Sequence, residues 1–263
     1  MKFDLKEFFF TFIQEIERQN SKKFLEENID KIEFAINQLS DFYKNYPKWI
    51  FLDEKNFDNT KNINSKNIDN FKIISVGDIH ADYDALKKII EIKLKYQQIT
   101  VIFLGDYVDR GDFSFEVFLL IIILNLLFFD TIYILPGNHE LYHYFKYQNA
   151  EFWNSDGILS FLFKPLRNLI EYLPLLISFK SILFIHGGFF DFNSNDEEFI
   201  KKLQNEKGIR LNDFIKLNEK NVFEIVWADY AGNYQDITYS KALGRPVKTE
   251  EDILRLQKTF NIN

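Results

Sequence analysis

The first helical pattern of hydrophobic positions lies at the start of the chain. Leu5, Phe8, Phe12 and Ile16 recur every three or four residues, which predicts a helix that ends before Asn20. The polar positions between them would face solvent.

A second stripe runs from Leu25 to Tyr43 with alternating steps of four and three residues, and it predicts one helix that ends before Pro47. The stripe spans barely three heptads, which is short for an extended coiled coil. We therefore expect this helix to pack on the main domain or on the first helix. A helical docking or dimerising surface over residues 21–45 is the alternative.

The pattern changes in the middle of the chain to short apolar runs separated by helical stretches. These runs, which are typical of buried strands, cover residues 71–76, 101–104, 132–135, 173–178 and 182–185. The last two flank the short segment 179–181, which predicts a strand pair. Helical patterns follow the first two runs. Strands that alternate with helices in this way indicate the α/β class.

The most apolar stretch of the chain covers residues 113–129. Its length is near the lower limit for a membrane span, and it contains Glu116 and Asn125. We interpret it as a buried crossover helix, and we expect no membrane partner.

Composition divides the chain into three parts. Residues 53–70 are rich in Asn, Asp and Lys and poor in apolar residues, which predicts a linker. A helical extension, 1–52, precedes this linker, and the main domain, 71–263, follows it.

Charge and cysteine content narrow the classes of function. The net charge is −7 without a block of Lys or Arg, which argues against nucleic acid as a partner. The chain has 0 Cys, so disulfides and thiolate metal sites are excluded. Acidic residues interrupt the first 20 positions, so they do not resemble a signal peptide, and we expect a cytoplasmic location.

Ligand-type residues follow four of the predicted strands directly. They are Asp78 and His80 after the first, Asp106 after the second, Asn138 and His139 after the third, and His186 after the last. Open α/β sheets place their ligand sites at the carboxyl ends of strands. Asp and His converging at such an edge form a plausible divalent-metal chelate. The sequence therefore predicts a metal site.

The segments around these residues resemble a known signature. They read Gly77-Asp78-Ile79-His80, Gly105-Asp106-Tyr107-Val108-Asp109-Arg110-Gly111, Gly137-Asn138-His139-Glu140 and His186-Gly187-Gly188. Together they are similar to the motifs of the PPP-type protein serine/threonine phosphatases, within the calcineurin-like metallophosphoesterase superfamily. The resemblance covers residue 71 to the C-terminus. It implies two stacked mixed β-sheets flanked by helices.

The resemblance also implies a ligand set for two divalent metal ions. Asp78 and His80 would hold the first ion, Asp106 would bridge both, and Asn138 and His186 would hold the second. Carboxylate, amide and imidazole ligands suit Mn, Fe or Zn without selecting among them.

Further residues take their roles from the same resemblance. His139 would be the general acid, oriented by Asp109, and Arg110 would bind the phosphate. Asn138 would also contact phosphate, and Arg245 would be a second phosphate-binding arginine. The segment Trp227-Ala228-Asp229 resembles the Trp-Ser-Asp segment of the family.

The chain departs from the family pattern at three places. Ala81 stands where the family usually has Gly, and Pro136 stands where many members have Arg. The family also has a last metal-binding His in an Arg-x-His strand, after a helix that here would span Thr249 to Thr259. No His follows His186. We therefore expect a domain without that strand, which is either truncated or degenerate.

The predicted activity is metal-dependent hydrolysis of phosphate monoesters, above all phosphoserine and phosphothreonine in proteins. A small phosphoester is the alternative substrate. A phosphodiesterase or dinucleoside-polyphosphate hydrolase of the same superfamily is one alternative, and a phosphoprotein-binding pseudophosphatase is another. The motif His139-Glu140-Leu141-Tyr142-His143 also matches the H-E-x-x-H pattern of zinc peptidases, but that pattern needs both His residues inside a helix. We expect His143 on a helix surface.

Overall fold

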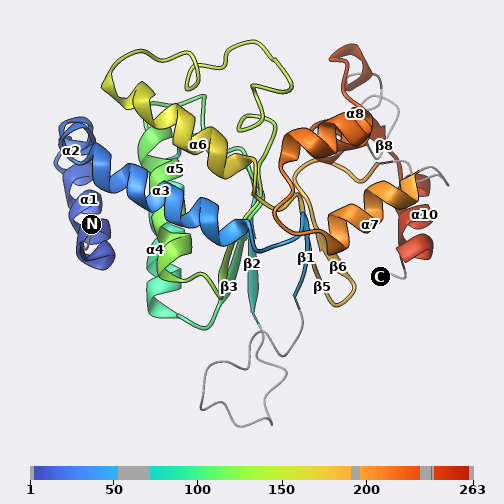
Figure 1. Cartoon of the computed structure of the whole chain (residues 1–263), viewed down its shortest axis with the longest axis horizontal. Coiled ribbons are helices and arrows are strands. Elements are labelled where there is room, and N and C mark those ends of the chain that lie inside the picture. Colours follow the sequence, from blue (N-terminus) through green and yellow to red (C-terminus); the bar gives the residue numbers. More distant parts are fainter. Residues whose placement is uncertain (1–2, 53–71, 191–195, 232–237, 239, 261–263) are drawn as a thin grey trace, which may run out of the picture.

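Two three-stranded sheets lie between two groups of helices (Figure 1). A computed structural model describes residues 3–52, 72–190, 196–231, 238 and 240–260. The predicted linker, 53–70, lies outside the described residues. The helices and strands run in the order α1 (Leu5–Glu17), α2 (Ser21–Glu27), α3 (Ile29–Tyr43), β1 (Trp49–Leu52), β2 (Ile73–Val76), α4 (Tyr83–Lys95), β3 (Thr100–Phe103), α5 (Ser114–Leu127), β4 (Ile132–Ile134), the 3-10 helix Ile158–Leu162, α6 (Phe163–Ile170), β5 (Leu176–Phe179), β6 (Ile182–Phe184), α7 (Glu197–Asn205), α8 (Leu211–Trp227), β7 (Asp229–Tyr230), β8 (Val247–Lys248) and α10 (Glu250–Phe260).

One sheet has the order β2-β3-β4, and its described strands are all parallel. Val76 pairs with Phe103, and Phe103 pairs with Ile134, so the three strands end level with one another. All four residues of β3 are buried, because helices cover one face and the second sheet lies on the other side. This register brings the loops after β2, β3 and β4 to one edge.

The second sheet has the order β1-β5-β6 and is mixed. β5 and β6 are antiparallel, with Phe179 opposite Ile182, which confirms the predicted strand pair. β1 pairs in parallel with β5, so residues at the end of the predicted helical extension form part of this sheet. The division at 52 and 71 stays a prediction.

α5 is the buried crossover helix that the sequence predicts. Eleven of its residues are buried, and it contacts α1, α3, α4 and β4. Glu116 accepts a hydrogen bond from Ser21 Oγ at 2.7 Å, and the Nδ2 group of Asn125 donates to the carbonyl of Ile132. Within the residues described above, no helix is long and apolar enough to cross a membrane.

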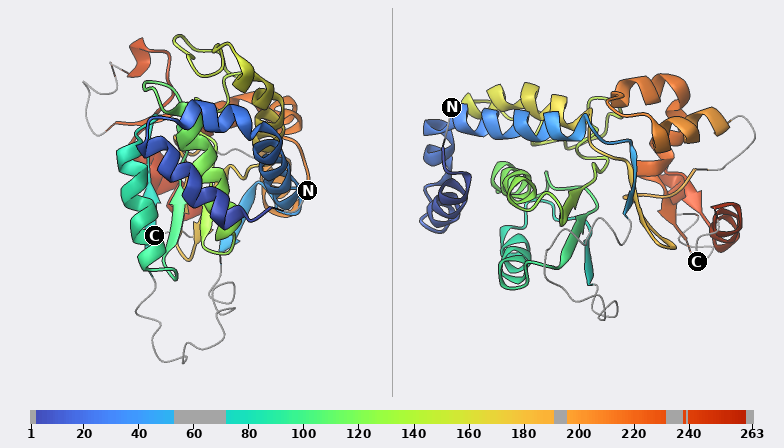
Figure 2. Two further views of the ribbon diagram at one scale, coloured as in Figure 1. Left: turned by 90° about the vertical axis from the view of Figure 1, so that its left-hand side faces the viewer. Right: turned by 60° about the horizontal axis from the view of Figure 1, so that its bottom comes forward.

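The N-terminal helices differ from the prediction in one respect. The single helix expected between Leu25 and Tyr43 is interrupted at Asn28, where φ is −122° and the side-chain amide donates to the carbonyl of Phe24 at 2.8 Å. Such local side-chain bonds compete with helical backbone pairing. α3 lies alongside α6 and also contacts α5, so its apolar stripe is packed within the chain (Figure 2). Docking of another molecule on residues 21–45 stays a prediction.

Candidate active site

The loops after β2 and β3 are joined by backbone hydrogen bonds. The amides of Ile79 and His80 both donate to the carbonyl of Asp106 at 3.0 Å, and Ala81 donates to Tyr107 at 2.9 Å. These loops also hold most of the positive-φ residues of the described chain that are not Gly, namely His80, Ala81, Asp106, Asp109 and Arg110. Each such residue costs about 1–3 kcal/mol and persists only where surrounding contacts fix it.

Two glycines allow the loops after β3 and β4 to approach each other closely. A Cβ on Gly105 would lie 2.3 Å from the amide nitrogen of Gly137, and Gly105 has a φ of 114°. A Cβ on Gly137 would lie 2.1 Å from Asp106 Oδ1 and 2.8 Å from His186 Cε1. Any larger side chain at position 137 would therefore displace two of the predicted ligands.

Glu140 connects the loops after β3 and β4 through hydrogen bonds. Its buried carboxylate accepts hydrogen bonds from the amides of Asp106 and Gly137 at 2.8 Å and of Tyr107 at 2.9 Å. Burial and the charge of Asp106 raise the pKa of Glu140 to about 7, although the amide donors act in the opposite direction. The sequence marks Glu140 only as part of a motif, whereas the structure gives it this positioning role.

The predicted metal ligands converge around Asp106. His80 Nε2 lies 3.6 Å from Asp106 Oδ2 and 3.8 Å from Asp78 Oδ2. On the other side, His186 Nε2 lies 3.4 Å from Asp106 Oδ1 and 3.1 Å from Asn138 Oδ1. The donor atoms of Asp78, Asp106 and His186 all lie within 4.8 Å of one another, as do those of His80, Asp106 and His139.

Both imidazoles direct Nε2 toward this cluster. His80 Nδ1 lies 2.8 Å from the carbonyl of Val108, and His186 Nδ1 lies 3.0 Å from the carbonyl of Leu104. These contacts favour a proton on Nδ1 and leave Nε2 as a lone-pair donor, which is the usual arrangement behind a metal-bound histidine. His80 Nε2 is buried without a hydrogen-bond partner in the described structure.

The ionisation of the cluster also suits a cation. Burial lowers the pKa of His80 and of His186, which favours neutral imidazoles, and burial raises the pKa of Asp106. A buried carboxylate is costly unless it is paired or coordinates a metal. The unpartnered His80 nitrogen and the buried Asp106 carboxylate together fit divalent metal ions. The assignment of individual ligands to either ion stays a prediction.

A second group of residues holds the imidazole of His139. Its Nδ1 lies 2.7 Å from Asp109 Oδ2, and Asp109 is fully buried. Asp109 also accepts hydrogen bonds from the Tyr147 hydroxyl at 2.5 Å and from the Phe152 amide at 2.7 Å. The carbonyl of His139 accepts a hydrogen bond from Trp153 Nε1 at 2.8 Å.

These contacts determine the ionisation of the pair. Burial acts to raise the pKa of Asp109, but hydrogen bonds from His139 and Tyr147 outweigh it and lower the pKa. Burial acts to lower the pKa of His139, and the neighbouring Asp109 and Asp106 outweigh it, so the net shift is upward. His139 Nε2 is left facing the cluster, 3.9 Å from Asp106 Oδ2.

The two predicted phosphate-binding arginines lie in different surroundings. Arg110 is exposed, and its Nη2 lies 3.5 Å from His139 Nε2, so it stands beside the cluster. Arg245 pairs with Asp229 at 3.1 Å and lies over the ring of Trp227. It lines a cavity of about 610 Å³ together with Trp227 and Tyr147. Tyr147 lines this cavity and also donates a hydrogen bond to Asp109, so Arg245 lies near the candidate site.

The peptidase pattern has no structural support among the described residues. His139 to His143 form turns rather than a helix, so the two imidazoles do not share a helix face. The expectation of His143 on a helix surface is therefore wrong. The short segment Pro136-Gly137 follows β4 and leads into a turn in which Glu140 accepts a hydrogen bond from the Gly137 amide.

Sequence reasoning missed Tyr147, Phe152 and Trp153. They lie in a loop without periodicity, and their contacts depend on the folded path of residues 142–153. The signal that the sequence offers for these three residues is the local abundance of aromatic side chains.

Comparisons with known proteins identify the family. The family model described as calcineurin-like phosphoesterase matches residues 71–262. The chain is 32% identical over 185 residues to the serine/threonine-protein phosphatase 2B catalytic subunit A2 of Saccharomyces cerevisiae, covering 68% of this chain and 27% of that protein. It is 33% identical over 120 residues to the serine/threonine-protein phosphatase PP2A-like PPG1 of Candida albicans, covering 43% of this chain and 28% of that protein.

A solved structure shares the fold. It is a protein serine/threonine phosphatase from Saccharomyces cerevisiae described as similar to human phosphatase PP5, with a TM-score of 0.58 and 19% identity, covering 92% of this chain and 75% of that one. The chain spans less than a third of the length of the two curated relatives named above. The expected α/β phosphoesterase fold is confirmed. From the family match and the strand-end motifs together, the chain belongs to the calcineurin-like phosphoesterase family.

Proposed function

We propose that this chain hydrolyses phosphate monoesters with the help of two divalent metal ions. The observation that carries the proposal is the position of His139. Its Nε2 faces the Asp106 cluster while its Nδ1 contacts the buried carboxylate of Asp109 at 2.7 Å. A proton donor beside a metal-ligand cluster is the pair of elements that phosphoester hydrolysis needs.

In this proposal, Asp78, His80 and Asp106 hold one ion, and Asp106, Asn138 and His186 hold the other. When bound, the ions would activate water near neutral pH and stabilise charge on the phosphate. The donor set accepts Mn, Fe or Zn.

The residues outside the ligand set bind the substrate and move one proton. Arg110 offers a planar guanidinium that can contact two phosphate oxygens at once. Asn138 and Arg245 are further phosphate contacts in the proposal. As the bond between phosphorus and the leaving oxygen breaks, the His139 imidazolium gives its Nε2 proton to that oxygen, and the Asp109 carboxylate stabilises the imidazolium before transfer.

Phosphoserine and phosphothreonine in proteins are the proposed substrates. Support comes from the curated relatives, which carry the name serine/threonine phosphatase and share about a third of their aligned residues with this chain. A serine or threonine alkoxide is a poor leaving group, so a positioned acid such as His139 matters most for these substrates.

Hydrolysis of p-nitrophenyl phosphate and bis-p-nitrophenyl phosphate with added Mn tests the proposal. The monoester should be hydrolysed and the diester should not. Asp106→Asn should abolish metal binding, whereas His139→Gln should keep metal binding and lose roughly 10²-fold or more in rate on a phosphoserine peptide. Faster turnover of the diester would favour a phosphodiesterase. Phosphopeptide binding without turnover in the Mn-loaded chain would favour a pseudophosphatase.

A further inference from the structure

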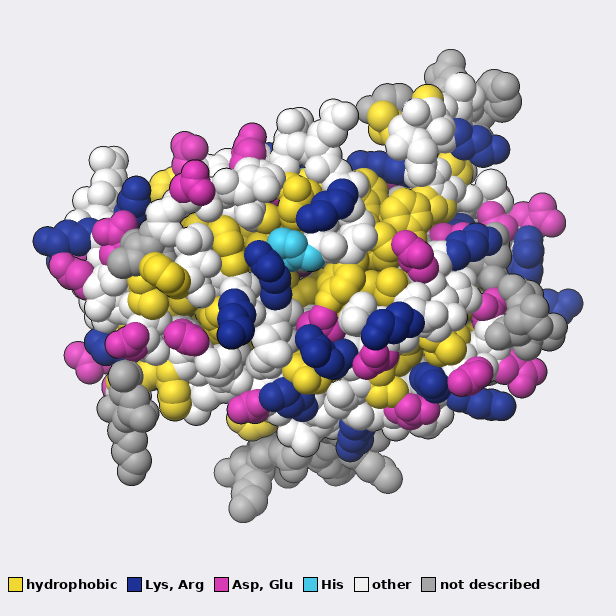
Figure 3. Space-filling view, turned by 45° about the horizontal axis from the view of Figure 1, so that its top comes forward, with side chains coloured by type: hydrophobic (Ala, Val, Ile, Leu, Met, Phe, Trp, Pro, Cys, Tyr) yellow, Lys and Arg dark blue, Asp and Glu magenta, His cyan; other side chains and the backbone are white. Residues whose placement is uncertain are grey.

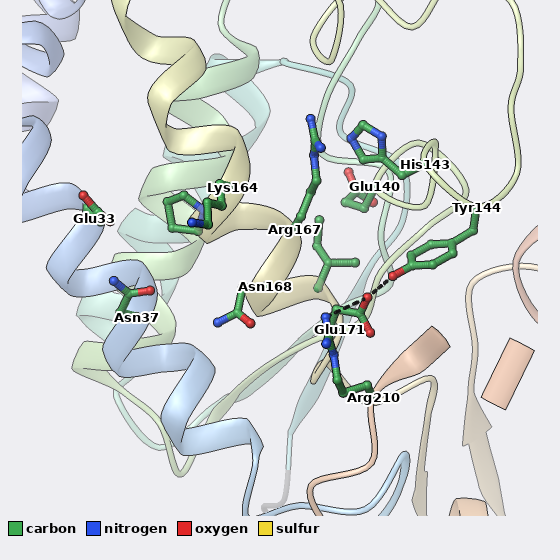
Figure 4. Close-up of a pocket in the computed structure, with 12 residues that line it drawn as sticks. Glu33, Asn37, Glu140, His143, Tyr144, Lys164, Arg167, Asn168, Glu171 and Arg210 are labelled. Carbon is green, nitrogen blue, oxygen red and sulfur yellow. Dashed lines mark hydrogen bonds and ion pairs between the residues drawn. The ribbon is translucent and has the colours of Figure 1, made fainter. Parts of the chain in front are cut away.

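A second polar cavity lies behind the turn that carries His139. Its volume is about 430 Å³, which is in the range of small-ligand pockets. None of the predicted metal ligands lines it (Figure 4). The side chains that line it are Glu33, Asn37, Glu140, His143, Tyr144, Lys164, Pro165, Arg167, Asn168, Ile170, Glu171 and Arg210.

Polar residues of two neighbouring helices that pack against each other line this cavity. On α6, Lys164, Arg167 and Asn168 line the cavity at helical spacing, and the apolar Pro165 and Ile170 of the same helix line it as well. On α3, Glu33 and Asn37 are spaced by one turn and line the cavity beside α6 (Figure 4). The walls therefore offer charged and amide groups together with apolar surface.

Two of the carboxylates in the cavity already have partners. Glu171 accepts a hydrogen bond from the Tyr144 hydroxyl and pairs with Arg210 at 3.5 Å. Glu140 directs its carboxylate to the backbone amides of the loops after β3 and β4. Both are therefore poor partners for a further cation.

Lys164 and Arg167 are in a different position. Both are exposed, and neither forms an ion pair within the part of the chain that the structure describes. Arg167 instead lies over the ring of Trp153 at 5.9 Å, which holds its guanidinium near the cavity wall. Figure 3 shows that Lys and Arg side chains gather around a histidine when the top of the molecule in Figure 1 is brought forward.

His143 adds a further polar atom. Its ring contacts the same Trp153 at 4.8 Å, and Figure 4 draws it beside Arg167. Its Nε2 is buried without a hydrogen-bond partner in the described structure. Burial and the nearby Arg167 lower the pKa of His143 to about 4, so the ring is neutral at neutral pH and can donate one hydrogen bond.

We propose that this cavity binds a phosphate monoester dianion, carried by a protein side chain, at a position distinct from the Asp106 cluster. Arg167 and Lys164 supply two positive charges for the dianion, and the guanidinium can contact two of its oxygens at once. His143 supplies a neutral donor beside Arg167, whereas the Asn168 amide already donates to Ser40 Oγ at 3.1 Å. A phosphorylated residue of a substrate or partner is thereby held while the Asp106 cluster is free for another phosphate.

Calorimetric titration of the Mn-loaded chain with inorganic phosphate tests this proposal. Wild-type protein should show two binding events. The double variant Lys164→Gln/Arg167→Gln should lose one of them, with an affinity drop of roughly tenfold or more. Arg110→Gln should weaken only the other. The matched control is Lys22→Gln/Lys88→Gln, which removes the same charge from exposed positions on α2 and α4 and should keep both events.

A second titration distinguishes a protein-borne phosphate from a free one. The probe is a short peptide whose phosphoserine oxygen is replaced by a methylene group, so that it cannot be hydrolysed. Arg110→Gln should still bind it, and Arg110→Gln combined with Lys164→Gln/Arg167→Gln should bind it roughly tenfold more weakly or worse, because only the weakened Asp106 cluster remains. If only inorganic phosphate binds, the cavity is a site for free anions, and the proposal that it takes a phosphate carried by a protein side chain is wrong.

Two results would overturn the site itself. One is unchanged phosphate binding in Lys164→Gln/Arg167→Gln with an unchanged melting temperature. The other is complete loss of phosphate binding in Arg110→Gln, since that would place all binding at the Asp106 cluster.

Discussion

Replacing Asp109 by Asn should separate proton donation from metal binding. In the structure the carboxylate of Asp109 accepts three hydrogen bonds, from His139, Tyr147 and Phe152. An asparagine at this position has one oxygen and one NH2 group. In either orientation of the amide, the NH2 group would face a donor that the carboxylate of Asp109 now accepts. The charged contact with His139 is lost, while the Asp106 cluster keeps all of its own side chains.

The magnitude follows from that one contact. A hydrogen bond to a charged partner contributes about 1.5–3 kcal/mol, which corresponds to a loss of about 10- to 150-fold in rate. The pKa of His139 should also fall in Asp109→Asn, because the carboxylate that raises it is gone. The acid is active when protonated, so the decline of rate with rising pH should begin at a lower pH in the variant.

The assay compares two leaving groups in the Mn-loaded chain. A serine alkoxide needs a proton in order to leave, whereas p-nitrophenolate does not, so Asp109→Asn should slow a phosphoserine peptide more than p-nitrophenyl phosphate. Tyr147→Phe is the matched control, because it removes one hydrogen bond from Asp109 and keeps the charge. Equal slowing on both substrates, with Mn binding intact, would refute the role of Asp109 in proton donation.

Three further predictions concern stability and the metal cluster. Glu140→Gln should lower the free energy of unfolding by about 2–4 kcal/mol in urea titrations, because its amide cannot accept from all three backbone donors; a loss below about 0.5 kcal/mol would contradict this. Gly137→Ala should weaken Mn binding in calorimetry, since its Cβ would lie 2.1 Å from Asp106 Oδ1, whereas Gly77→Ala, with nothing within 4 Å, should bind Mn as the wild type does. Burial lowers the pKa of Lys48 to about 7 in the folded chain. Between about pH 7 and 10 the unfolded chain therefore binds more protons than the folded chain. The free energy of unfolding should rise over this range by up to about 1.4 kcal/mol per pH unit. Lys48→Met should remove that contribution, and an identical pH slope in the variant would show that Lys48 is not its source.

The convergence of the site could be predicted because it depends on strand register. Asp78, Asp106 and Asn138 each follow a strand of one parallel sheet, and parallel strands bring their carboxyl ends to the same edge. His186 follows a strand of the other sheet, yet lies 3.4 Å from Asp106. Local apolar runs and the residues directly after them contain this information.

The supporting contacts could not be predicted because they depend on the folded path of the loops. Tyr147 reaches Asp109 from a segment without periodicity, and Glu140 reaches the amides of another loop. β1 became evident only through its pairing with β5. The interruption at Asn28 is a local competition between side chain and backbone, which a continuous apolar stripe conceals.

Anomalous diffraction from crystals grown with Mn would test the central claim most directly. The proposal predicts two Mn peaks that share Asp106, one beside Asp78 and His80 and the other beside Asn138 and His186, with His139 bound to neither ion. A Mn peak coordinated by His139 Nε2, or ordered Mn elsewhere with none at Asp106, would contradict the separation of metal binding from proton donation.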